Sequence, residues 1–195
     1  MIVERDLKIV EFIDLVELAT NKHIQELFFE NVNNVVCSRR LAKLANVEYI
    51  KRCKLDSNKY YYYGNDSKKP NIRLVRHDLL LTDYLVELIK LGANIIDFKR
   101  NLVIDNVICD GFIKFKLDDK IYTQVLEVQL SNKISDCIDK YSDFKTKIYN
   151  AKLNDRFEII PTIICLTDLK DKVNLKGYRV RYLDTNLQNL KEVLI

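Results

Sequence analysis

The spacing of apolar residues in the first third of the chain predicts three helices followed by a β-hairpin. Apolar side chains recur at the 3.6-residue spacing of an amphipathic helix over residues 5–18, and Thr20 is a good N-cap for a second, short helix. A third helix is expected over residues 35–45, and two strand-like segments, 47–53 and 60–63, flank a polar turn. The residues expected to face inward from the helices are Ile9, Phe12, Ile13, Val16, Ile24, Leu27, Phe28, Cys37, Leu41 and Leu44.

The rest of the chain predicts strands interrupted by helices. An apolar helix over residues 78–91 ends at Gly92, and the Asp110-Gly111 pair predicts a break within the second strand that follows. The expected strands are 95–98, 102–115, 122–130, 159–166 and 178–182, with a helix over 134–153 and a last helix from about residue 186. From residue 78 onward the order is therefore α-β-β-β-α-β, and the whole chain is predicted to be α+β.

One polar stretch divides the chain. Residues 64–70 bring together Gly, Asn, Asp, Ser, two Lys and a Pro, which is typical of a linker. We therefore predict a first domain over residues 1–64, a linker over 65–76 and a second domain over 77–195.

The distribution of charge sets one segment apart. Residues 1–30 carry a net charge of −4, residues 31–76 carry eleven basic and three acidic side chains, and the remaining residues are balanced. A basic block of this kind indicates a surface that meets an anionic polymer, whereas a merely solvated surface seldom concentrates one sign so strongly.

The first domain resembles a winged helix-turn-helix, on the motifs TNKHIQELFF at 20–29, SRRLAKL at 38–44 and VEYIKR at 47–52. The resemblance implies that the third helix is the recognition helix, that the hairpin is the wing and that the ligand is double-stranded DNA. A helical module that binds protein is the alternative. The residues expected to contact DNA are Asn34, Ser38, Arg39, Arg40, Lys43, Lys51, Arg52, Lys54 and Lys59.

The second domain resembles the PD-(D/E)xK nucleases, which have a restriction-endonuclease-like fold. Asp110 and Glu127 stand at the positions of the two carboxylates that hold a divalent ion in that family, so Mg²⁺ is the implied cofactor. Gln129 takes the place of the Lys that orients the attacking water, and Cys109 takes the place of the Pro. The resemblance implies catalytic roles for Asp110, Glu127 and Gln129, while common turn and strand patterns are the alternative.

Both halves together resemble the replication-relaxation proteins of plasmids and mobile elements, which join a winged helix to a degenerate nuclease-like domain. Besides the motifs above, the resemblance includes His77 at the central helix, LEVQLS at 126–131 and DKYSDF at 139–144. Family members often carry an acid at the position of Gln129, so this chain departs from them there.

Two further sets of residues have a plainer interpretation beside a functional one. Lys140-Tyr141 is similar to a pair that nucleases of this fold place near the active site. The plainer expectation is an amphipathic helix with one solvent-exposed and one buried face. Its exposed face would carry Lys133, Lys140, Lys145 and Lys147, and its buried face Ile138, Tyr141, Phe144 and Ile148. Likewise Glu87 is a candidate third metal ligand, but an ion pair with Lys90 is the stronger expectation.

Composition excludes several classes of protein. No apolar run approaches the roughly 20 residues that span a bilayer, and the N-terminus lacks the pattern of a signal peptide, so we expect a cytoplasmic protein without membrane contact. The five Cys are scattered and predict reduced thiols, and the two His are too distant for a metal site.

Three hypotheses follow. The first is a sequence-specific DNA-binding protein of a plasmid or phage, acting in replication, mobilisation or regulation, in which the second domain is a scaffold or a platform for a homodimer. The second is a Mg²⁺-dependent endonuclease or nickase that the winged helix targets to DNA. The third is a protein-interaction module or inhibitor.

Overall fold

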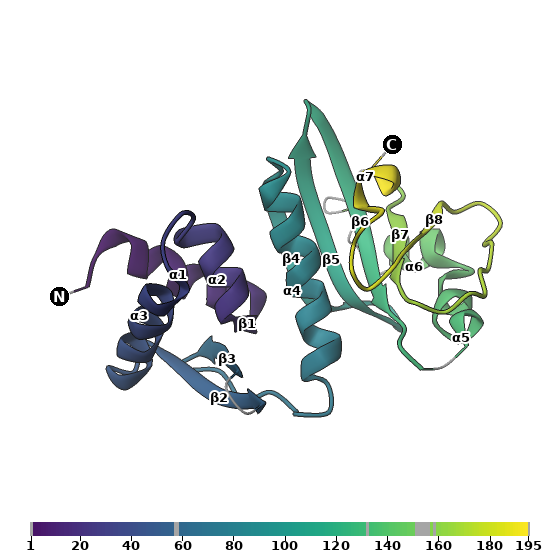
Figure 1. Ribbon diagram of the computed structural model, residues 1–195. Helices are drawn as coiled ribbons and strands as arrows, with labels where there is room; N and C mark the ends of the chain where they lie inside the picture. The colour runs from purple at the N-terminus through teal and green to yellow at the C-terminus, as the bar shows by residue number, and fades with distance from the viewer. Residues whose placement is uncertain (1, 57–58, 132, 151–156, 158, 195) are drawn as a thin grey trace. The chain divides into compact units, whose positions relative to one another are not determined.

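The chain folds into two compact units, residues 1–86 and 87–195, and is α+β as predicted. The structure is a computed structural model that describes residues 2–56, 59–131, 133–150, 157 and 159–194. Figure 1 shows helices and a small sheet in unit 1 and a larger sheet in unit 2. The division between the units falls within one long helix, α4 (Val75–Lys90).

Three helices open unit 1 in the order that the apolar spacing predicts. They are α1 (Glu4–Val16), α2 (Asn21–Phe28) and α3 (Asn34–Asn46). Most of the expected inward positions are buried, while Leu27 and Phe28 are only half-buried. The buried ones are Ile9, Phe12, Ile13, Val16, Ile24, Cys37, Leu41 and Leu44.

A three-stranded sheet completes the first part of unit 1. The strands β2 (Ile50–Asp56) and β3 (Lys59–Gly64) form the expected antiparallel hairpin, whose tip lies outside the described residues. A two-residue strand, β1 (Ala19–Thr20), pairs with β3, so the strand order is β1-β3-β2. The apolar spacing did not predict β1, because two residues carry no periodicity.

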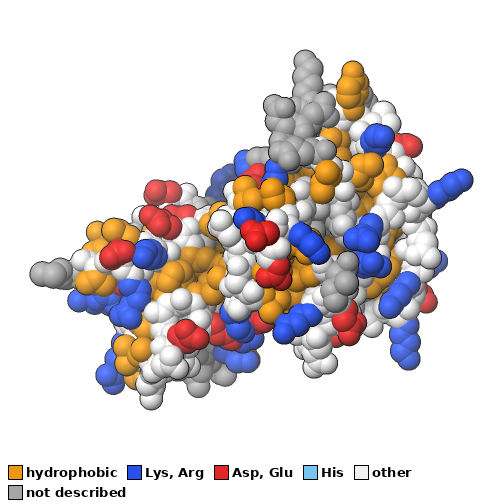
Figure 2. All heavy atoms as spheres, turned by 90° about the horizontal axis from the view of Figure 1, so that it is seen from above, with side chains coloured by type: hydrophobic (Ala, Val, Ile, Leu, Met, Phe, Trp, Pro, Cys, Tyr) orange, Lys and Arg blue, Asp and Glu red, His pale blue; other side chains and the backbone are white. Residues whose placement is uncertain are grey.

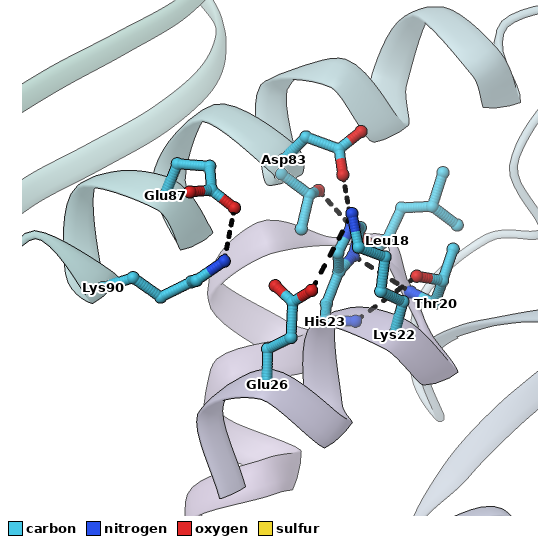
Figure 3. A network of polar contacts seen from close by, with 9 residues as sticks. Leu18, Thr20, Lys22, His23, Glu26, Asp83, Glu87 and Lys90 are labelled. Atoms are coloured by element: carbon cyan, nitrogen blue, oxygen red, sulfur yellow. Dashed lines mark hydrogen bonds and ion pairs between the residues drawn. The ribbon is translucent and has the colours of Figure 1, made fainter. Parts of the chain in front are cut away.

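The N-terminal part of α4 is tied to the rest of unit 1 by buried polar contacts (Figure 3). The Thr82 hydroxyl donates to the Leu18 carbonyl at 2.7 Å, and His23 Nε2 lies 2.8 Å from Asp83 Oδ1. His23 also lies in the first turn of α2, where its Nδ1 accepts from the Thr20 N–H at 3.1 Å. Thr20 is thus the N-cap that the sequence predicts, with His23 as its reciprocal partner.

Five strands form the sheet of unit 2. They are β4 (Asn94–Ile104), β5 (Val107–Leu117), β6 (Lys120–Val128), β7 (Thr162–Leu166) and β8 (Val180–Leu183). The order is β4-β5-β6-β7-β8; the first three pair antiparallel, and β7 and β8 are added in parallel.

The expected strand break at Asp110-Gly111 is wrong. Gly111 lies inside β5 and pairs with Arg100 on one side and Leu126 on the other. The chain turns instead at Asp105, whose φ of 55° lies in the left-handed region. An Asp adopts that region readily, so Asp105-Asn106 makes the turn without a Gly.

Helices between β6 and β7 cover the sheet of unit 2. The single helix expected over 134–153 is divided into α5 (Ile134–Ile138), a 3₁₀ turn (Asp139–Tyr141) and α6 (Phe144–Asn150), and residues 151–153 lie outside the described part. Their expected inward residues pack against β5, β6 and β7 in one apolar cluster. A short C-terminal helix, α7 (Leu190–Val193), begins later than residue 186.

None of the helices in the described part of the chain is long and apolar enough to cross a bilayer.

Candidate functional site

The exposed side of α3 combines basic and apolar side chains. Leu41 and Leu44 turn inward, so Arg39 and Lys43 are exposed, as the sequence predicts. Near the start of the same helix, Val35 is 51% exposed. On the face of the molecule that Figure 2 shows, exposed apolar side chains lie among basic and acidic ones. A helix face with this mixture suits a ligand that offers both charge and apolar edges.

The hairpin adds a second set of basic side chains to unit 1. Four of the residues expected to contact DNA are exposed on it: Lys51, Arg52 and Lys54 on β2, and Lys59 on β3. The Arg52 guanidinium lies 5.4 Å from the centre of the Tyr60 ring, which keeps this side chain close to the strand surface.

A groove of about 740 Å³ lies between α3, the hairpin, α2 and α4, and the acidic side chains of Glu26 and Asp83 also line it. Asn34 and Ser38 of α3 line one part of it, and Arg52 and Lys59 of the hairpin line another. Asn21, at the start of α2, donates to the Ser38 hydroxyl at 2.8 Å and so fixes that side of the groove. Four of the nine predicted DNA-contacting residues therefore share one groove.

Arg40 forms an ion pair with Asp6 within unit 1. Its Nε donates to Oδ1 of Asp6 at 2.6 Å, and its Nη2 bonds the other carboxylate oxygen. Asp6 is fully buried, and its hydrogen bond from Arg40 holds its pKa below the usual value despite burial. Arg40 therefore has a structural partner, which its position in a basic motif did not predict.

In unit 2, Asp110 and Glu127 lie close together at the end of the β5–β6 pairing. The last pair before them joins Gly111 to Leu126. Asp110 Oδ2 accepts from the Val128 N–H at 2.8 Å, across the two strands, while Glu127 is only 2% exposed. Neighbouring strands thus bring the two predicted carboxylates to one place.

Two side chains from the segment after β6 engage both oxygens of Glu127. Lys140 Nζ donates to Oε2 at 2.8 Å, and the Tyr141 hydroxyl donates to Oε1. Lys140 Nζ also donates to the Ile108 carbonyl at 2.7 Å. The prediction that Tyr141 is buried is confirmed. The expectation that Lys140 lies on the solvent-exposed face is wrong, since its side chain reaches back to the sheet and bonds Glu127 and the Ile108 carbonyl.

Burial dominates the electrostatics of this carboxylate pocket, which we define as Asp110, Glu127, Lys140 and Tyr141. Burial raises the pKa of Glu127 to about 7 and the charge of Asp110 adds to the increase, while Lys140 and Tyr141 act in the opposite direction. Burial likewise raises the pKa of Tyr141 well above its usual value.

Gln129, the third residue of the predicted catalytic set, forms its hydrogen bonds with backbone groups rather than with Asp110 or Glu127. The Gln129 side chain donates to the Lys133 carbonyl at 3.1 Å, and its backbone N–H donates to the Leu166 carbonyl at 2.9 Å. Glu87, the other candidate ligand, forms the expected ion pair with Lys90 at 2.7 Å (Figure 3).

These residues do not fit a divalent cation as they stand. An ammonium group already takes one oxygen of Glu127, and a phenol takes the other. Within the described residues, no group of three or more His, Cys, Asp or Glu side chains is arranged to hold a metal ion.

The ion pairs that Asp6 and Lys140 form were not predicted from the sequence. Asp6 gave no signal, because an acid in the first turn of a helix is ordinarily solvated. Lys140 did give one, since Lys140-Tyr141 was similar to a pair found near nuclease sites, but helical spacing favoured a solvated face.

The chain matches no protein-family model, and no significant match was found among the curated proteins or the solved structures compared with it.

Proposed function

We propose that unit 1 binds double-stranded DNA, with α3 and the β2–β3 hairpin forming the contact surface. The single observation that carries this proposal is the groove between them, which predicted DNA-contacting residues line from both sides. Eleven of the basic residues of the chain fall between residues 31 and 76, the segment that forms α3, the hairpin and the beginning of α4.

The order of elements supports a winged helix. Unit 1 runs α1-β1-α2-α3-β2-β3, and its sheet has the order β1-β3-β2. In this interpretation α3 enters the major groove, and its groove-lining Asn34 and Ser38 suit base edges, while the hairpin meets phosphates.

The role proposed for unit 2 is that of a scaffold with a nuclease-like architecture. From α4, whose last residues belong to unit 2, the chain continues through β4, β5 and β6, then helices, then β7, which is the expected α-β-β-β-α-β order. Cleavage is not part of the proposal, because Lys140 and Tyr141 engage Glu127 and Gln129 bonds the backbone. The replication-relaxation resemblance, and with it a role in a plasmid or phage, rests on short motifs and this order, and we retain it as a proposal.

The test measures duplex DNA affinity by fluorescence anisotropy with the full chain. Replacing Arg52 and Lys59, the two predicted basic residues that line the groove, together by Ala should weaken binding at least about tenfold, and adding Arg39→Ala and Lys43→Ala on α3 should bring the loss to about a hundredfold, because each group is proposed to contact DNA. Arg40 is left intact, so that the fold is preserved.

The matched control is Lys145→Ala, which removes an exposed basic residue of unit 2. It should leave the affinity unchanged. Equal affinity of the wild type and the four-residue variant would contradict the proposal, and would favour a protein partner for the same surface.

A further inference from the structure

The two flanks of α3 line different cavities of unit 1. Asn34 and Ser38 line the groove toward the hairpin, whereas a second cavity, of about 450 Å³, lies between the other flank and the beginning of α1. Four side chains that line this α1-side cavity are basic and the others are apolar; the basic ones belong to Arg5, Arg39, Arg40 and Lys43. We propose that the α1-side cavity binds a phosphate of the DNA strand opposite the hairpin, and that Arg5 is the residue that contacts it. This inference rests on the proposed DNA binding.

The geometry of α3 is the first reason. Ser38 and Arg40 are two residues apart, which places them about 200° apart around the helix axis, and the exposed Val35 and Arg39 lie between them on the outward side. A helix is about 10–12 Å across and the major groove is about 12 Å wide, so a helix that enters the groove has a phosphate backbone on each flank. If the hairpin meets one backbone, the other comes to the α1-side cavity.

The placement of Arg5 is the second reason. Its guanidinium Cζ lies 4.1 Å from the centre of the Phe29 ring, and Phe29 is itself buried. Stacking on a fixed ring restrains the plane of the guanidinium. The N–H groups lie in that plane and remain available at its edge, where a phosphate can accept two of them.

Uncompensated charge is the third reason. Among the residues that the structure describes, no hydrogen bond or ion pair joins Arg5, Arg39 or Lys43 to an acidic side chain. The acidic side chains in the first turn of α1 are already paired, Asp6 with Arg40 and Glu4 with Lys8. Three cations beside one cavity repel one another, and an anion bound among them relieves that repulsion.

The experiment measures the affinity of the full chain for two duplexes of unrelated sequence by fluorescence anisotropy, at a series of salt concentrations. Arg5→Ala should weaken binding to both duplexes about fivefold, because a phosphate contact carries no sequence information. The slope of log affinity against log salt concentration should become less steep by about 0.9, the contribution of one phosphate.

Two further variants and a control accompany Arg5→Ala. Arg5→Gln should show the same loss and covers the case in which the Ala variant does not fold. Arg5→Lys keeps the charge and should keep the wild-type salt slope. Lys145→Ala removes the same charge from an exposed position of unit 2 and should bind as the wild type does.

The outcomes separate this inference from the proposed function. If Arg52→Ala with Lys59→Ala weakened binding while Arg5→Ala and Arg5→Gln bound like the Lys145→Ala control, only the role of the α1-side cavity would be overturned. A loss with one duplex alone would overturn it as well, since Arg5 would then contact a base. If the wild type bound neither duplex, the proposed function would fail and this inference with it.

Discussion

At the scale of single residues, the ion pair between Asp6 and Arg40 joins α1 to α3. Asp6 also accepts from the Val3 N–H at 2.8 Å, so its carboxylate is fully enclosed by donors. Arg40→Ala would leave that carboxylate buried without its cation, and should lower the free energy of unfolding by about 3 kcal/mol. Urea denaturation measures the change.

Arg39→Ala is the matched control for that prediction. Arg39 is the exposed neighbour of Arg40, so its removal should change the free energy of unfolding by no more than about 0.5 kcal/mol. An equal loss of stability in both variants would mean that the Asp6 contact contributes little.

The same pair predicts how stability depends on pH. The hydrogen bond from Arg40 lowers the pKa of Asp6 below its usual value of 3.8, so the folded state binds this proton more weakly than the unfolded chain. The stabilisation should be complete above about pH 5 and should be lost as the pH falls through the folded pKa. Urea denaturation at a series of pH values should therefore show a steeper acid loss in the wild type than in Asp6→Asn. Parallel curves would contradict it.

Long basic side chains limit what a sequence predicts at this scale. Arg40 and Lys140 stand where helical spacing indicates a solvated face, yet each reaches a buried carboxylate that lies far away in the sequence. Spacing determines the direction of the Cα–Cβ bond, whereas four or more rotatable bonds decide where the charge ends. Exposed Arg39 and Lys43, on the same helix as Arg40, were predicted from the same pattern.

At the scale of elements, α3 depends on the apolar face that turns its basic residues outward. Leu44 is fully buried. Leu44→Ala should therefore lower the free energy of unfolding by about 2–5 kcal/mol, because the removed side chain leaves a cavity beneath the helix. Thermal or urea denaturation measures the loss.

Val35→Ala in the same helix is the control, since Val35 is 51% exposed. It should change the free energy of unfolding by no more than about 0.5 kcal/mol. If Leu44→Ala were as mild, the inward face of α3 would be a different one, and Arg39 and Lys43 would lose their assignment to the surface.

Elements with a clear period were predictable, and those held by tertiary pairing were less so. α1 and α3 follow the apolar spacing closely, while the first strand of the hairpin, expected over 47–53, is found at Ile50–Asp56. The β4–β5 turn was misplaced because Asp110-Gly111 carries a strong turn signal, while pairing of Gly111 on both sides keeps it within β5. The carboxylates were found by their order in the sequence, but their partners Lys140 and Tyr141 became evident only in the folded chain.

At the scale of the whole molecule, the uneven charge predicts a strong salt effect on DNA binding. If about five basic side chains neutralise phosphates, a plot of log affinity against log salt concentration should have a slope near −4.5. Arg39→Ala with Lys43→Ala should make the slope less steep, because fewer counterions are then released. A slope near zero in the wild type would mean that phosphates contribute nothing.

The histidine cap of α2 has a consequence for how unit 1 opens. Because His23 Nδ1 accepts from the Thr20 N–H, its proton lies on Nε2, which donates to Asp83. One imidazole ring therefore links the first turn of α2 to the middle of α4, over 60 residues of sequence. Fraying of either helix at this point breaks a bond of the other, so their amide protons should exchange with solvent as one cooperative group rather than one turn at a time.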